Sequence, residues 1–119
     1  MRENLSQKDL LELYVENGRI SDKATLGGDY KVNNKAVDKL IKIYKVIEKD
    51  LDLAKGILHP LLDSDVSGWA ATHCLALGIY EKEAVAVLKS IKNNPSSGIL
   101  GLSAEETLKE WRKGKLSIY

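Results

Sequence analysis

The sequence predicts an all-α protein with five to six helices. Apolar residues recur at intervals of three and four along most of the chain, which is the spacing of one face of an α-helix. Residues that typically begin or end helices separate these segments, chiefly Ser, Asn, Asp and Gly. No run of β-branched residues alternates with polar ones between turn residues, as strands would require. The length of 119 residues fits one such domain, spanning residues 1–119.

The composition excludes several classes of protein. Apolar residues make up 44% of the chain and charged residues 29%, close to the average of globular domains, so extended disorder is not expected. Eighteen basic and seventeen acidic side chains give a net charge of +1, so no overall field draws the protein to nucleic acid or to a membrane. The polar start is unlike a signal peptide, and no apolar run reaches the length of a membrane span. We therefore expect a cytoplasmic protein.

The first helix is expected over residues 6–18. Ser6 caps its first turn, and Asp9 takes the place of the Glu or Gln that usually completes a capping box. Gly18 fits the left-handed residue that closes many helices. Its apolar stripe consists of Leu10, Leu11, Leu13 and Tyr14. Residues 19–32 contain a glycine pair and no sustained periodicity, which predicts a loop, either a plain connector or a functional one.

The clearest helical periodicity lies in residues 33–52, where Asn33 or Asn34 supplies the cap. The apolar side consists of Ala36, Val37, Leu40, Ile41, Ile43, Tyr44, Ile47 and Leu51. The opposite side carries Lys35, Lys39, Lys42, Lys45 and Lys49. Because the apolar side is wide, this helix is expected to pack against more than one neighbour.

Three shorter helices are expected between residues 53 and 92. The first ends near His59-Pro60, because proline lacks a backbone donor and disfavours helical geometry in the residue before it. Asp63 and Asp65 are expected to cap the next helix, over residues 66–77. A further helix spans residues 81–92, followed by an exposed loop rich in Asn, Pro and Ser.

The last helix is expected to begin at Ser103. Glu106 lies three residues later and completes a capping box. Leu108 and Trp111 share its inward face, and Gly114 closes it.

Residues 57–78 resemble the two-helix unit of HEAT-type repeats, in which a turn rich in Asp and Pro leads to a helix that opens with Val and carries paired alanines. The matching residues are His59, Pro60, Asp63, Asp65, Val66, Ala70, Ala71, Leu77 and Gly78. Ser67 stands where such repeats have the Arg that ties neighbouring repeats together. The resemblance extends over residues 36–116 and implies antiparallel helix pairs in a short HEAT-like stack rather than a long solenoid.

The wider pattern is similar to small bacterial helical domains that serve as immunity proteins to secreted or contact-delivered toxins, as in contact-dependent growth inhibition. This resemblance implies a toxin inhibitor without enzymatic activity, which binds one cognate toxin domain as a monomer and covers its active site. For a nuclease toxin, acidic side chains such as Asp63, Asp65, Glu81 and Glu83 would meet the basic substrate groove. Two alternatives remain open: an adaptor or subunit of a larger assembly, and RNA binding through the lysine side of residues 33–52.

The residues themselves predict no catalytic, cofactor or metal site. His73 and Cys74 are adjacent in an expected helix, so their side chains point about 100° apart and cannot form a nucleophile and base pair. Cys74 is expected in the core and His73 at a helix surface or boundary. Asp63 and Asp65 lie between the two histidines, but helix capping explains both without a metal ion.

Two surfaces are candidates for binding a partner. The first is a cluster of Asp63, Asp65, Trp69 and His73 around the start of the expected helix at residues 66–77. Its acidic groups are suited to a charged donor, and its tryptophan to anchoring an interface. The second is the lysine side, because residues 31–60 carry seven basic and four acidic side chains. We expect the first cluster to bind the partner and the lysines to form a solvated helix face.

Overall fold

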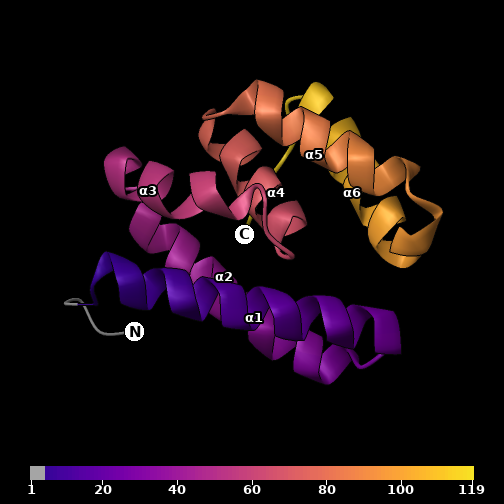
Figure 1. Ribbon diagram of the computed structural model, residues 1–119, viewed down its shortest axis with the longest axis horizontal. Helices are drawn as coiled ribbons and strands as arrows, with labels where there is room; N and C mark the ends of the chain where they lie inside the picture. Colours follow the sequence, from indigo (N-terminus) through magenta and orange to yellow (C-terminus); the bar gives the residue numbers. More distant parts are fainter. Residues whose placement is uncertain (1–4) are drawn as a thin grey trace.

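The computed structural model describes residues 5–119, which form six α-helices and one short 3₁₀ turn (Figure 1). In chain order these are α1 (Gln7–Gly27), α2 (Tyr30–Ile47), α3 (Leu51–Leu61), α4 (Ser67–Leu77), α5 (Glu81–Asn93), η1 (Pro95–Ser97) and α6 (Ile99–Arg112). Residues 5–119 contain no β-strand, so the prediction of an all-α fold is confirmed. None of these helices combines the length and the apolar character that crossing a bilayer requires.

The helices form two groups that α3 connects. α1 and α2 make an antiparallel hairpin, seen as the lower layer in Figure 1, and α4, α5 and α6 pack on one another above it. The core lies between these groups and around α3. Its largest fully buried apolar side chains are Tyr14, Leu40, Ile43, Ile47, Ile57, Leu58, Leu88 and Leu108.

Helix α1 is much longer than the sequence suggested, and the prediction of a loop over residues 19–32 is wrong. Only Gly28 and Asp29 of that segment lie outside helices. The capping box of Ser6 and Asp9 is present as expected. The helix then continues to Gly27, and Gly28 closes it in the left-handed conformation (φ 75°). Gly18 is therefore a mid-helix residue instead of a terminator. The continuation escaped detection because the buried face of α1 changes from apolar to small and polar side chains, namely Asn17, Gly18, Ser21 and Ala24.

Helix α2 buries the apolar side that the periodicity predicted and exposes its lysines. It begins at Tyr30, earlier than expected, because the Asp29 side chain accepts a hydrogen bond from the Val32 amide. It also ends early, at Ile47. Asp50 caps the following helix by accepting from the Leu53 amide (3.2 Å), so Leu51 belongs to α3, where it is exposed.

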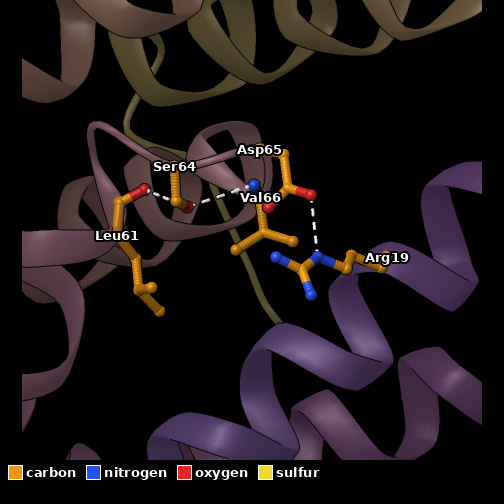
Figure 2. A network of polar contacts seen from close by, with 5 residues as sticks. All are labelled: Arg19, Leu61, Ser64, Asp65 and Val66. Carbon is orange, nitrogen blue, oxygen red and sulfur yellow. Dashed lines mark hydrogen bonds and ion pairs between the residues drawn. The ribbon is translucent and has the colours of Figure 1, made fainter.

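The capping roles predicted for Asp63 and Asp65 are wrong. Val66 occupies the N-cap position of α4 and makes no side-chain capping bond. Instead, the Ser64 hydroxyl donates to the Leu61 carbonyl (2.7 Å) and accepts from the Val66 amide (3.1 Å), which closes the turn between α3 and α4 (Figure 2). Because Ser64 holds the turn, the two carboxylates are free for other contacts.

Two further boundaries differ from expectation. Pro60 lies within the last turn of α3 rather than beyond its end, where a missing donor disturbs only the final turn. Helix α6 begins at Ile99, directly after Gly98 (φ 56°), so Ser103 lies within the helix and does not cap it. The Ser103 carbonyl accepts a hydrogen bond from the Thr107 hydroxyl (3.0 Å). Gly114 (φ 71°) closes the helix as expected.

Candidate binding cleft

A cleft of about 460 Å³ opens between the α1–α2 hairpin and helices α4 to α6. Its volume lies in the range of roughly 300–1,000 Å³ that is usual for ligand sites. The polar lining includes Ser21, Asp22, Thr25, Asn33, Asp65, Ser67, Thr72, Ser97, Ser103 and Thr107. The apolar lining includes Val37, Trp69, Leu88, Ile91 and Leu100. Two other hollows are lined by α1 alone and by α5 with Trp111, so neither gathers polar groups from several elements.

Asp22 is the ionisable group that the cleft perturbs most. Its Oδ1 accepts a hydrogen bond from the Trp69 indole Nε1 (3.1 Å). Burial raises the pKa of the Asp22 carboxyl to about 6, and the nearby Asp65 charge adds to this increase, while the Trp69 hydrogen bond opposes it. The carboxyl is therefore largely ionised at pH 7, although its surroundings favour the neutral form.

Trp69 connects the cleft to the core beneath it. It is partly buried, and its ring centroid lies 5.9 Å from that of His73, one turn further along α4. His73 Nδ1 and the Tyr14 hydroxyl are hydrogen bonded at 2.6 Å, and the Tyr44 ring packs against the imidazole at 4.9 Å. Burial lowers the pKa of His73 to about 3, so this imidazole is neutral at physiological pH.

Asp65 lies at one end of the cleft and is held by an arginine. Arg19 extends from α1 toward the α3–α4 turn, and its Nε donates to Asp65 Oδ2 at 2.7 Å (Figure 2). Both side chains are more than half exposed, so this pair contributes little to stability. It does fix the position of Asp65 relative to the α1 side of the cleft.

The structure brings together two of the four residues predicted to bind a partner. Asp65 and Trp69 both line the cleft, and Asp63 is exposed on the same turn but does not line it. The surface position predicted for His73 is wrong, because the side chain is fully buried. His73 therefore supports Trp69 from below and does not itself reach the surface.

The position of Asp22 was not predicted, because residues 19–32 lack the apolar periodicity that indicates a helix. The signal that could have revealed it is a polar stripe at helical spacing, Asn17, Ser21, Asp22 and Thr25, which continues the face begun by Tyr14. An apolar pattern alone cannot detect a helix face that borders a polar cleft.

Other expectations concern residues away from the cleft. Cys74 is buried, as predicted, and burial raises the pKa of its thiol to about 12. Trp111 is partly buried and packs against the core. Within residues 5–119, no three His, Cys, Asp or Glu side chains are grouped closely enough to hold a metal ion.

Comparison with known proteins identifies no relative of this chain. No family model, no curated protein and no solved structure matches the chain.

The cost of burying Asp22 leads to a prediction about stability. We expect Asp22→Asn to raise the free energy of unfolding at pH 7.5 by about 1 kcal/mol, once solvent screening of this partly exposed carboxyl is allowed for. The pKa of Asp22 in the folded protein lies above its ordinary value of 3.8. The stabilisation that comes from protonated Asp22 is therefore fully present below pH 3.8 and is lost as the pH rises through about 6. Urea denaturation of both proteins at pH 4 and pH 7.5 measures this difference.

The comparison with the parent protein is needed because His73 acts in the opposite direction. Its pKa is lowered from 6.5 to about 3, so His73 stabilises the fold increasingly as the pH rises through this range. This contribution is common to both proteins and cancels. An equal effect of Asp22→Asn at the two pH values would contradict the assigned pKa shift.

Proposed function

We propose that this chain is a non-catalytic binding domain that recognises one protein partner through the cleft and neutralises it, as an immunity protein neutralises a toxin. The cleft is the observation that carries the binding role, because it gathers an ionised carboxylate, an indole and several hydroxyls from different elements. The resemblance of residues 57–78 to HEAT-type repeats, and of the wider chain to small immunity domains, supports the neutralising role.

Exposed aliphatic side chains beside the cleft support a protein partner. Leu26, Ile99 and Leu102, here called the apolar rim, are 58%, 50% and 65% exposed. A Cβ placed on Gly98 would lie 3.9 Å from the Leu26 side chain, so the end of α1 and the start of α6 carry these residues close together. Exposed aliphatic side chains that gather in one place are typical of protein interfaces.

Steric occlusion is a sufficient mechanism for such a domain. A standard interface buries about 800 Å² on each partner, which is a small share of the 7220 Å² surface of this chain. An interface centred on Trp69 and bordered by the apolar rim would exclude substrate from whatever surface of the partner it covers. No chemical step by this protein is needed.

The test is co-expression with the protein encoded by the neighbouring gene, with growth and binding affinity as readouts. We expect the chain to restore growth, and Asp65→Lys to weaken the complex by more than about tenfold, because it reverses a charge at the contact. Breaking the exposed Arg19–Asp65 pair should change stability little, which a melting curve verifies. Lys42→Glu, on the exposed side of α2, is the matched charge reversal and should have a much smaller effect.

Other outcomes would contradict the proposal in distinct ways. Unchanged affinity for Asp65→Lys with loss for Lys42→Glu would move the interface to the lysine face of α2. Growth that stays inhibited despite a tight complex would exclude neutralisation and leave a binding or adaptor role.

A further inference from the structure

We infer that the cleft receives a lysine or arginine side chain from the protein partner, with its charged head against Asp22 and its aliphatic stem along Trp69. This inference specifies the chemistry of the partner and rests on the proposed function only in taking that partner to be a protein.

The cleft carries negative charge that is only partly compensated. Among the described residues that line the cleft, the two charged side chains are both carboxylates, Asp22 and Asp65. Asp65 has Arg19 as its partner. Asp22 has no cation in hydrogen-bond contact within residues 5–119, and only its Oδ1 accepts a hydrogen bond. A cationic group bound at the free oxygen would therefore neutralise a partly buried charge.

The surroundings of Asp22 match a basic side chain. The Trp69 ring offers an apolar and π-rich surface, on which the stem of Lys or Arg packs well. The hydroxyl-bearing residues Thr25, Ser67 and Ser103 also line the cleft, and a hydroxyl oxygen can accept a hydrogen bond from an ammonium or guanidinium group.

The apolar rim favours a protein segment over a small free amine as the occupant of the cleft. The apolar rim lies outside the polar lining of the cleft, and a small amine bound at Asp22 would leave it uncovered. A chain that carries a basic side chain with apolar neighbours can cover both, which gains the free energy of burying the exposed aliphatic groups.

The charged and titratable groups that face Asp22 fix the expected pH dependence. They are Asp65 on the α3–α4 turn, which is paired with Arg19 of α1, and Tyr14, also on α1. The raised pKa of Tyr14 keeps its hydroxyl neutral. The cleft lining supplied by α2, α5 and α6 is uncharged. Because the Asp22 pKa is about 6, a cation should bind about tenfold more weakly at pH 5 than at pH 7.

The experiment uses the whole chain and a capped pentapeptide with a central lysine, flanked on each side by serine and then leucine. The chain has two tryptophans, so its two indole N–H signals in a nitrogen–proton correlation spectrum can be assigned with Trp111→Phe. We expect a saturable shift of the Trp69 signal with this peptide. Peptides with norleucine or glutamate at the centre should bind at least about tenfold more weakly, since they lack the positive charge.

Variants and a free amine separate the possible explanations. Asp22→Asn keeps an oxygen for the Trp69 hydrogen bond and should weaken the lysine peptide about tenfold, whereas Asp38→Asn, exposed on α2, should leave it unchanged. Equal affinity for n-butylamine and for the peptide would overturn the assignment to a protein segment. A peptide affinity that is insensitive to Asp22→Asn or to pH, or a Trp69 signal that does not shift, would overturn the inference entirely.

The outcome is independent of the neutralisation assay. If the peptide fails to bind while Asp65→Lys abolishes neutralisation, this inference falls and the proposed function stands. If the peptide binds but growth is never restored, this inference stands and the proposed neutralising function falls.

Discussion

Replacing Tyr14 with alanine is expected to lower the free energy of unfolding by about 4 kcal/mol, among the largest effects available to a single substitution in this chain. The Tyr14 ring is completely buried where α1 meets α4. Its hydroxyl is hydrogen bonded to His73 Nδ1 at 2.6 Å, and the other ring nitrogen of His73 already lacks a partner within residues 5–119. Alanine would therefore leave a cavity and a buried imidazole with no hydrogen bond.

Urea denaturation followed by circular dichroism measures this loss, and two variants separate its causes. Tyr14→Phe keeps the ring and should cost about 1–2 kcal/mol, the penalty of leaving a buried polar group unpaired. Tyr30→Ala removes a tyrosine that is 70% exposed, so it should change stability by no more than about 0.5 kcal/mol. If Tyr14→Phe costs as much as Tyr14→Ala, packing of the ring is not the main contribution.

Replacing Gly18 with alanine is expected to destabilise the fold by about 1–2 kcal/mol, although alanine is the better helix former. A Cβ on Gly18 would lie 2.7 Å from Val66 Cγ1 and 3.6 Å from the Trp69 ring. Val66 is fully buried and β-branched, so its χ1 rotation is restricted and it has little room to move aside. α1 would have to move away from the turn that carries Asp65, which would also disturb the Trp69–Asp22 hydrogen bond.

Gly27→Ala is the matched control, because both residues lie in the same helix. A Cβ on Gly27 would meet no atom within 4 Å, so alanine there should stabilise the helix by about 0.5–1 kcal/mol. Thermal melting of the two variants measures both effects. Stabilisation by Gly18→Ala would show that the close approach of α1 to Val66 is not required.

A helix of this protein can be predicted from the sequence where it buries an apolar stripe. α2 does, and its apolar and lysine sides were predicted correctly, except that Lys49 and the exposed Leu51 lie beyond its end. The second half of α1 buries Asn17, Gly18 and Ser21 instead, because it packs closely against the α3–α4 turn and borders a cleft. The amphipathic pattern disappears at that point, so the sequence predicts a loop there. The helical position of Asp22 therefore could not be predicted.

The error at His73 has a different physical cause. Helix α4 is buried on several sides, with Ala70, Ala71, Cys74 and Leu75 all in the core. In such a helix the periodicity of apolar residues does not indicate which face a polar residue occupies. His73 is accommodated by a hydrogen-bond partner from α1, 59 residues away in the sequence, and a contact of that range cannot be derived from local patterns.

Several hydroxyl side chains along the cleft are positions at which this protein can diverge, or be re-engineered, with little cost. Ser67, Ser97 and Ser103 line the cleft and are at least partly exposed. Under the proposed function, substitutions at these serines would change what the cleft presents to a partner. The buried residues Tyr14, Gly18 and His73 would meanwhile maintain the packing of the helices.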